Sequence, residues 1–243
     1  MGRVSDRTVL ITGGARGMGA AFARRLVEEG ASVVIADVLA EEGAAVAAEF
    51  GEGARFEPLD VTDEAAWQAV VERAESAFGP VSGLVNNAGI VHVDPIEKLS
   101  EADYRKVIDV NQVGVFLGMK AVLPSMRRAG GGSIVNISSI GGIIAFSGIL
   151  GYVASKWAVR GMTKAAAQEF GADGVRVNSV HPGVVATDMT ATSERSQGMV
   201  HDQPLPRAAT ARELADLVLF LISAESGYCT GAEFVADGGY TTR

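Results

Sequence analysis

Short runs of β-branched and aliphatic residues alternate along the chain with longer amphipathic runs that are rich in alanine and glutamate. The short runs predict strands, and their continuous apolar character is typical of strands buried on both faces of a sheet. The long runs predict helices, several of which end next to a glycine. The predicted strands cover residues 8–12, 32–36, 55–59, 83–85, 133–137, 175–180 and 232–236. The predicted helices cover residues 17–29, 41–50, 63–78, 101–128, 152–170 and 211–223.

The regular alternation of strands and helices is typical of a parallel sheet with helices on both of its faces. We therefore predict an α/β protein with one doubly wound parallel sheet, a Rossmann fold, in a single domain that spans residues 1–243. No linker, internal repeat or low-complexity segment interrupts the pattern. The least regular segment covers residues 186–207. Because irregular segments of this length are typically functional, we predict that it forms a flap over a substrate.

The composition narrows the functions that such a fold can serve. Of the 243 residues 48% are hydrophobic, which is enough for a large core, and the net charge is −8. An acidic chain is poorly suited to nucleic acids or anionic membrane surfaces, which favour lysine and arginine. No run approaches the roughly 18 apolar residues of a membrane span, and the N-terminus lacks the apolar core of a signal peptide. We expect a cytoplasmic protein that binds neither nucleic acid nor membrane.

A glycine-rich segment follows the first predicted strand and opens the first predicted helix. Residues 12–19 read Thr-Gly-Gly-Ala-Arg-Gly-Met-Gly, a variant of the dinucleotide-binding fingerprint. Gly13 can form the sharp turn, while Gly17 and Gly19 let the backbone approach a pyrophosphate and let the helix pack on the sheet. The helix N-terminus, which includes Met18, supplies free N–H groups and a partial positive charge. The segment therefore predicts a dinucleotide site.

The second predicted strand is followed by Asp37, 18 residues beyond Gly19. A carboxylate at this place can accept hydrogen bonds from both ribose hydroxyls of an adenosine and repels a 2′-phosphate. Arg16 favours NADP(H), because a basic residue in this loop often contacts a 2′-phosphate. It can equally hold a diphosphate. A buried like-charge contact costs more than an exposed arginine gains, so we predict NAD(H) rather than NADP(H). An aspartate that starts a turn is the structural alternative.

Three polar residues form a candidate catalytic group. Tyr152 and Lys156 are one helical turn apart and share a face of the helix. A nearby ammonium favours the phenolate and lowers the tyrosine pKa, which is otherwise about 10. Ser139 lies just past the strand that ends at residue 137, at the edge where a parallel sheet carries its active site. Its hydroxyl can hold a substrate oxygen while Tyr152 moves the proton. Taken alone, the tyrosine–lysine pair also arises by chance on helices.

Taken together, these motifs resemble the short-chain dehydrogenase/reductase family over essentially the whole chain. Within the family, residues 13–19, 154–157 and 177–183 look most similar to bacterial 3α,20β-hydroxysteroid dehydrogenases and their relatives. The resemblance implies a nicotinamide-dependent oxidoreductase that interconverts a secondary alcohol and a ketone. The matching residues are those of segment 12–19, Asp60, those of segment 86–89, Asn111, Ser139, Tyr152, Lys156, Pro182 and Gly183.

The resemblance also implies a role for residues of the adenine half of the site. Asp60 and Val61 would flank the adenine, and the Asp60 carboxylate would accept from its amino group. Asn87, Ala88 and Gly89 would lie along the ribose and the diphosphate and stabilise the central strand.

For the nicotinamide half, the resemblance implies that Lys156 also binds the ribose hydroxyls. Asn111 would interrupt the long helix locally and hold a water that passes protons between Lys156 and solvent. The backbone of Val185 and the side chain of Thr187, which follow the segment 182–183, would fix the carboxamide. In ketone reduction the cofactor would carry the hydride, and Tyr152 would donate the proton.

Other functions remain open at this point. A 3-oxoacyl thioester reductase shares the scaffold but usually prefers NADPH, which Asp37 disfavours. A catalytically silent dinucleotide sensor is the alternative from another class, and the complete catalytic set argues against it. The apolar segment 141–146 suits a hydroxysteroid or another hydrophobic carbonyl compound without identifying it.

The remaining polar residues predict no metal site. The three histidines show no ligand spacing, and we interpret His181 as a hydrogen-bonded structural residue. The predicted helices that begin at Glu101 and Tyr152 have long apolar faces. We therefore expect the homotetramer that is usual in the family.

Overall fold

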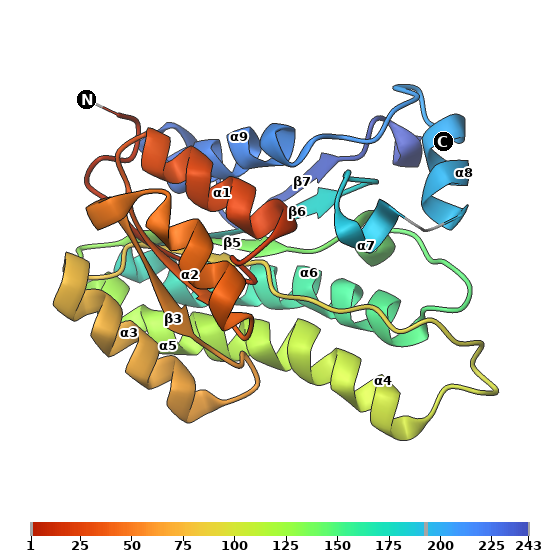
Figure 1. Cartoon of the computed structure of the whole chain (residues 1–243), viewed down its shortest axis with the longest axis horizontal. Helices are drawn as coiled ribbons and strands as arrows, with labels where there is room; N and C mark the ends of the chain where they lie inside the picture. Colours follow the sequence, from red (N-terminus) through yellow and green to blue (C-terminus); the bar gives the residue numbers. More distant parts are fainter. Residues whose placement is uncertain (1, 192–193, 243) are drawn as a thin grey trace.

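The computed structural model describes residues 2–191 and 194–242 (Figure 1). Seven parallel strands form one sheet in these residues, in the order β3-β2-β1-β4-β5-β6-β7. The chain winds outward from β1 in one direction and from β4 in the other, which confirms the predicted doubly wound Rossmann topology. The strands are β1 Thr8–Thr12, β2 Ser32–Asp37, β3 Ala54–Pro58, β4 Gly83–Asn86, β5 Gly132–Ile137, β6 Val175–Pro182 and β7 Glu233–Ala236.

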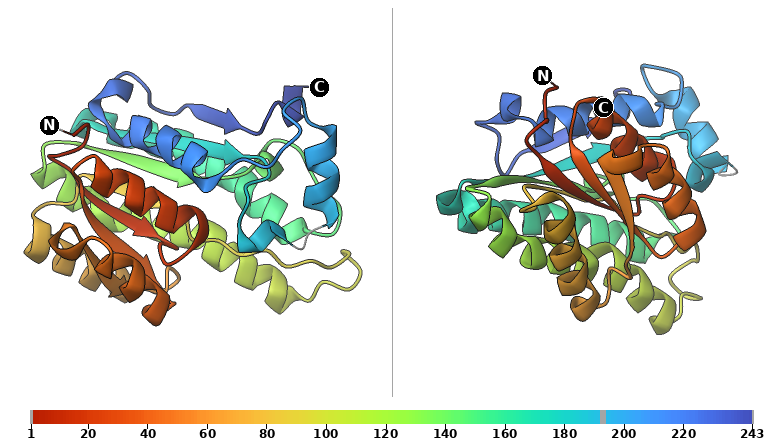
Figure 2. Two further views of the ribbon diagram at one scale, coloured as in Figure 1. Left: turned by 45° about the horizontal axis from the view of Figure 1, so that its top comes forward. Right: turned by 60° about the vertical axis from the view of Figure 1, so that its left-hand side comes forward.

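Helices cover both faces of the sheet, and each layer has its own apolar core (Figures 1 and 2). Phe22 and Leu26 belong to the core on the side of α1, α2 and α9. Trp67 and Val122 belong to the core on the side of α3, α5 and α6. The helices are α1 Gly17–Glu28, α2 Ala40–Ala48, α3 Glu64–Phe78, α4 Glu101–Ile108, α5 Gly114–Arg128, α6 Leu150–Phe170, α7 Asp188–Ala191, α8 Glu194–Asp202 and α9 Ala211–Ile222.

A π-helical turn, Asp109–Val113, joins α4 to α5 in the long helix Glu101–Arg128. The predicted local interruption at Asn111 is therefore confirmed. By length and composition alone the helix could cross a membrane, with a mean hydropathy of 1.3 in its most apolar window, of which 44% is buried in the fold. Here α5 packs on the sheet and α3, which is the behaviour of a core helix.

The segment 186–207, predicted to be the least regular part of the chain, is more regular than expected. It contains the two short helices α7 and α8, while residues 192 and 193 of the predicted flap lie outside the described residues. Neither helix shows the apolar period that identifies helices in a sequence, which is why the prediction missed them. The start of α7 is held by the Thr190 hydroxyl, which donates to the Thr187 carbonyl at 3.1 Å. Both helices lie beyond the carboxyl ends of the central strands (Figure 2).

Candidate active site at the carboxyl ends of the strands

The glycine loop between β1 and α1 has the conformation that its sequence predicts. Gly13 and Gly17 have φ angles of 61° and 56°, in the left-handed region that favours glycine. A methyl group on Gly19 would lie 2.1 Å from the Gly13 carbonyl oxygen, so Gly19 allows the helix to pack on its own loop rather than on the sheet. Arg16 gives α1 no side-chain cap, and the first N–H groups of the helix stay available to an anion. Met18 is partly buried and packs with its side chain on the core.

The end of β4 is tied to this loop by Asn87 and Thr12. The Asn87 amide donates to the carbonyl oxygens of Thr12 and Gly13, both at 3.0 Å. In return the Thr12 hydroxyl accepts from the N–H groups of Asn87 and Ala88 at 3.0 and 3.1 Å. The Asn87 side chain is thus committed to the shape of the loop.

Asp37 ends β2 with its carboxylate turned toward the glycine loop. One oxygen accepts from the Ala15 N–H at 3.0 Å and the other from the Leu39 N–H at 3.1 Å. The turn-forming role and the position beside the dinucleotide site therefore coexist in one residue, which is only 9% exposed. Arg16 is exposed, and its side chain has no hydrogen-bond or ion-pair partner within the described part of the chain.

The residues predicted to flank the adenine follow β3. The Asp60 carboxylate accepts from the Thr62 N–H at 2.9 Å and from the Thr62 hydroxyl at 2.8 Å, which closes a tight turn. Val61 is buried, and its carbonyl accepts from the Trp67 indole at 3.0 Å. The turn leaves Asp60 exposed at the carboxyl edge of the sheet.

Ser139, Tyr152 and Lys156 come together where β5 ends and α6 begins. The Ser139 hydroxyl accepts from the Gly141 N–H at 3.0 Å. A methyl group on Gly141 would lie 3.3 Å from the Tyr152 ring and 3.4 Å from the Ser139 hydroxyl, so the two side chains are neighbours. The Lys156 ammonium lies 5.6 Å from the centre of the Tyr152 ring and donates to the Ile137 carbonyl at 2.8 Å. The predicted catalytic group is therefore assembled around the end of one strand.

Burial sets the proton affinities of this group. It raises the pKa of Tyr152, and the polar side chain of Ser139 offsets part of that effect. This is the opposite of the sequence-based expectation, which considered the ammonium and not the burial of the phenol. Burial also lowers the pKa of Lys156 to about 8, which still leaves the amine mostly protonated at pH 7. At neutral pH the pair is thus a phenol beside an ammonium.

Asn111 connects the π-helical turn to the rest of the site. Its amide accepts from the Ile90 N–H at 2.8 Å and donates to the Ile90 carbonyl at 2.9 Å. It also donates to the Ser155 hydroxyl at 3.2 Å. A methyl group on Gly89 would lie 3.3 Å from the Asn111 oxygen and 3.5 Å from the Lys156 nitrogen. The structure therefore brings Gly89, Asn111 and Lys156 together, as the sequence predicts.

The segment after β6 borders the site on the side of the glycine loop. A methyl group on Gly183, which follows Pro182, would lie 2.7 Å from the Asp237 α-carbon, so this glycine permits a close crossing. Among the described residues, the buried N–H of Val185 has no hydrogen-bond partner. The Thr187 methyl lies 3.6 Å from the position that a methyl group on Gly17 would take. The loops that follow β1 and β6 thus lie next to each other at the carboxyl edge of the sheet.

Two residues that the predicted site leaves out hold its catalytic loop. His181 on β6 is completely buried and bonds the Ser139 carbonyl through Nδ1 at 3.1 Å. Arg160 on α6 donates to the Gly142 carbonyl at 2.7 Å. Their sequence signals are a histidine directly before Pro182 and an arginine one turn after Lys156, and neither is specific.

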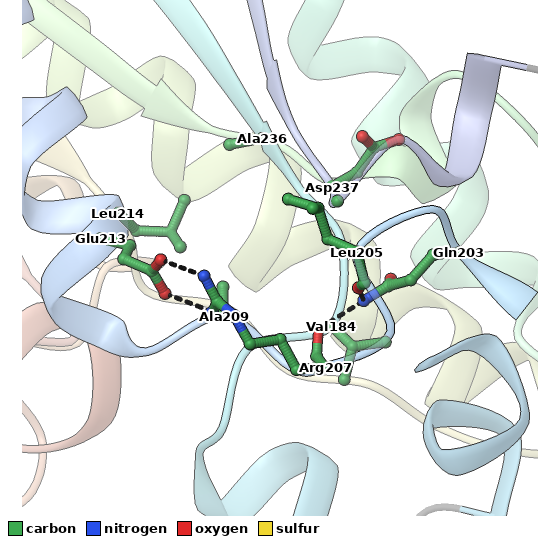
Figure 3. A pocket seen from close by; sticks show the side chains of 10 residues that line it. Val184, Gln203, Leu205, Arg207, Ala209, Glu213, Leu214, Ala236 and Asp237 are labelled. Carbon is green, nitrogen blue, oxygen red and sulfur yellow. Dashed lines mark hydrogen bonds and ion pairs between the residues drawn. The ribbon is translucent and has the colours of Figure 1, made fainter. Parts of the chain in front are cut away.

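A separate pocket of about 170 Å³ lies at the far end of the flap segment (Figure 3). Gln203 lines it and donates to the Leu205 carbonyl at 2.7 Å, and Arg207 pairs with Glu213 at 2.6 Å across its wall. Glu213 and Leu214 belong to α9, and none of the three predicted catalytic side chains lines this pocket. It therefore belongs to the attachment of the flap and not to the catalytic group.

The residues present fit a nicotinamide dinucleotide. The uncapped N-terminus of α1 suits the diphosphate, Asp37 lies beside it, and the free N–H of Val185 can bind a carboxamide oxygen. Within the described residues, no group of three His, Cys, Asp or Glu residues could hold a metal ion.

Comparison with known proteins agrees with this geometry. A family model described as enoyl-(acyl carrier protein) reductase matches residues 13–241. A 3-alpha-(or 20-beta)-hydroxysteroid dehydrogenase of Mycobacterium tuberculosis is 50% identical over 238 residues, which cover 98% of this chain and 90% of that protein. A trans-4-hydroxycyclohexanecarboxylate dehydrogenase of Sinomonas cyclohexanicum is 48% identical over 248 residues, with 98% and 94% covered. A cyclopentanol dehydrogenase of Comamonas testosteroni is 42% identical over 248 residues, with 99% of each chain covered.

The matches extend along almost the whole chain, and the curated relatives are named as dehydrogenases of alcohols. This protein is accordingly an oxidoreductase of alcohols and ketones that uses a nicotinamide dinucleotide. The glycine loop, the serine after β5 and the tyrosine and lysine of α6 thus stand in the fold that their sequence resemblance implies. The chain belongs to the short-chain dehydrogenase/reductase family.

Proposed function

We propose that this protein is an NAD(H)-dependent dehydrogenase that interconverts a secondary alcohol and a ketone, with Tyr152 as its acid and base. One observation carries the proposal: the Tyr152 ring and the Ser139 hydroxyl lie on either side of Gly141, and the Lys156 ammonium lies 5.6 Å from the centre of the Tyr152 ring. A hydroxyl that holds an oxygen, a phenol that moves a proton and a cation that stabilises the phenolate are the parts that this reaction needs.

The bound nicotinamide would supply the hydride chemistry. In ketone reduction, Ser139 donates a hydrogen bond to the substrate oxygen, and Tyr152 transfers its proton to the same oxygen. The Lys156 ammonium stabilises the phenolate that remains, and Asn111 and Lys156 lie on the route by which a solvent proton returns. In alcohol oxidation the phenolate takes the hydroxyl proton. Because burial raises the pKa of Tyr152, this direction gains from rising pH.

NAD(H) is the proposed cofactor because of the charge at the end of β2. The carboxylate of Asp37 is fixed by two backbone N–H groups and is almost fully buried, so it cannot turn away from a 2′-phosphate. Arg16 has no such fixed position. The repulsion from Asp37 therefore outweighs the attraction to Arg16.

A hydrophobic cyclic alcohol is the proposed substrate. The curated relatives described above are named for a hydroxysteroid, a hydroxycyclohexanecarboxylate and a cyclopentanol, each a hydroxyl compound with a carbon ring. Exposed apolar side chains lie on two segments that follow the sheet edge, namely Val91 and Val93 after β4 and Met189 in α7. A 3-oxoacyl thioester is the second candidate. The matching family model is described as an enoyl-(acyl carrier protein) reductase, whose substrate is also an acyl thioester.

We further propose a cytoplasmic homotetramer. Phe116 on α5 and Trp157 on α6 are 48% and 46% exposed, on helices whose other sides pack against the sheet. Apolar side chains of this size on a surface favour burial against another copy. Light scattering at micromolar concentration should give four times the mass of 25.2 kDa, and a purely monomeric sample would refute the tetramer.

A paired screen tests the function. The purified protein is assayed with NAD⁺ and with NADP⁺ against cyclopentanol, cyclohexanol, a 3α-hydroxysteroid and a 3-hydroxybutyryl thioester. We expect NADH formation from the cyclic alcohols and little reaction with NADP⁺. Activity on the thioester alone, or a strong preference for NADP⁺, would overturn the proposal.

A further inference from the structure

His181 lies inside the fold on β6, the strand next to β5, which leads to Ser139. It belongs to β6, is 0% exposed and has polar partners on both ring nitrogens. Nδ1 lies 3.1 Å from the carbonyl oxygen of Ser139, and Nε2 lies 2.9 Å from the hydroxyl of Ser179. Both nitrogens of this buried ring are therefore satisfied, one of them by the backbone of a predicted catalytic residue.

The partners fix which nitrogen carries the proton. The Ser139 carbonyl can only accept, so Nδ1 must donate to it. Burial lowers the pKa of His181, so the ring is neutral near pH 7 and Nε2 is an acceptor. Ser179 then donates to Nε2, because its other acceptor, the Ala232 carbonyl, is more distant at 3.5 Å. The chain Ser179 → His181 → Ser139 is therefore directional.

This chain ends on the backbone of the residue that holds the substrate oxygen. The Ser139 side chain is oriented by the N–H of Gly141, and its backbone carbonyl is anchored by His181. The next residue after His181 is Pro182, which begins the segment that leads to Val185 and Thr187. His181 thus fixes Ser139 relative to the strand that carries the nicotinamide side of the site.

We infer that His181 is a positioning residue, which sets the Ser139 hydroxyl at the correct distance from Tyr152 and from the bound carbonyl. The inference rests on the proposed function, because it assigns a catalytic consequence to Ser139. Arg160, Glu233 and Lys156 are the charged groups whose fields reach the imidazole. Burial lowers the pKa of His181 most and the two cations lower it further, whereas the hydrogen bond with the Ser139 carbonyl and the charge of Glu233 raise it.

Two amide substitutions separate the roles of the ring nitrogens. His181→Asn places an amide N–H near the position of Nδ1, so it can still donate to the Ser139 carbonyl. His181→Gln places its amide near the position of Nε2, where it meets Ser179 and leaves the Ser139 carbonyl without a donor. The two variants are of similar polarity, and both are neutral at every working pH.

For ketone reduction with NADH we expect His181→Asn to keep kcat within about threefold of the wild type. His181→Gln should lose about 10- to 100-fold in kcat, which is the effect of a small misplacement of a catalytic group. The Kd for NADH, measured by fluorescence, should change less than about twofold in both variants, because the side chain of His181 bonds Ser139 and Ser179, neither of which is assigned to the cofactor. The kinetic isotope effect with 4-deuterated NADH should rise in His181→Gln as the chemical step slows.

Equal kcat values for the Asn and Gln variants would overturn the inference. A lower kcat in His181→Gln that is accompanied by weaker NADH binding would also overturn it. If either variant fails to fold, Ser179→Ala provides the test, because it removes only the donor to Nε2. We expect Ser179→Ala to lose about threefold in kcat, and an unchanged kcat would refute the directional chain. A wild type without any dehydrogenase activity would instead refute the proposed function. The inference would then be judged on crystal structures, where only His181→Gln should displace the Ser139 carbonyl.

Discussion

The loop after β5 and the flap after β6 lie at the same edge of the sheet but are built in opposite ways. The Ser139 loop is held by three side chains of β6 and α6: His181 on its carbonyl, Arg160 at Gly142, and Lys156 on the last carbonyl of β5. The flap consists of two short helices with mostly exposed side chains, and Met189 is 53% exposed. A fully hydrogen-bonded loop keeps one geometry, whereas an exposed segment can adapt.

This difference separates two tasks. The rigid loop suits the proton and hydride chemistry, which must be the same for every substrate. The flap suits selection of the substrate. Changes in the loop should therefore affect all substrates equally, whereas changes in the flap should affect each substrate differently.

Removal of the buried cation should have the largest effect. Lys156→Met keeps the length of the side chain and deletes the ammonium that stabilises the Tyr152 phenolate. We expect kcat to fall by about 10²- to 10⁴-fold for every alcohol. The matched control is Lys120→Met on α5, where the lysine is 58% exposed and pairs with Glu64. Steady-state assays should show nearly normal turnover for the control, and a loss that depends on the substrate would contradict the division of tasks.

The same variant should change the pH dependence of stability. Because the folded protein lowers the pKa of Lys156 from 10.5 to about 8, the unfolded chain binds more protons between these values. Lys156 therefore destabilises the fold most below pH 8, and this cost disappears as the pH rises toward 10.5. The difference in the free energy of unfolding between the wild type and Lys156→Met should change by about 3 kcal/mol in favour of the wild type as the pH rises from about 8 to 10.5. Urea unfolding at several pH values measures this difference. A constant difference would show that the amine is not buried as described.

A third prediction concerns the cofactor. Asp37→Ser removes the charge that opposes a 2′-phosphate, while the serine hydroxyl can still accept from one of the two N–H groups. We expect the ratio of kcat/KM for NADP⁺ to that for NAD⁺ to rise by about 10- to 100-fold. Glu42→Ser, which removes an exposed carboxylate from the start of α2, is the control. An unchanged ratio in Asp37→Ser would mean that Asp37 only shapes the turn.

The smallest effect should come from the flap. Met189→Ala shortens an exposed apolar side chain of α7, and we expect the KM for a hydroxysteroid to rise about two- to fivefold. The KM for cyclopentanol should change less, because a small ring reaches less of the flap. The control is Leu205→Ala, in the part of the segment that attaches the flap beside α9 and not in α7, and it should change neither value. Equal changes for both substrates would place Met189 outside the substrate path.

The sequence predicts the sheet, its helices and the assembly of Ser139, Tyr152 and Lys156, because each depends on local patterns. Apolar runs identify buried strands, and a parallel sheet collects the residues that follow its strands at one edge. The pKa of Tyr152 was expected in the wrong direction because burial depends on residues from several elements. The helices of the flap and the partners of His181 were missed for the same reason, since tertiary contacts and not local periodicity create them.

The most direct test of the account is Tyr152→Phe, which removes one hydroxyl group from α6 beside the Ser139 loop. Binding of NADH, followed by fluorescence, and reduction of cyclohexanone are measured on the same preparation. We predict an NADH affinity within about twofold of the wild type and a loss of at least about 10²- to 10⁴-fold in kcat. Turnover close to that of the wild type would contradict the assignment of Tyr152 as the group that moves the proton.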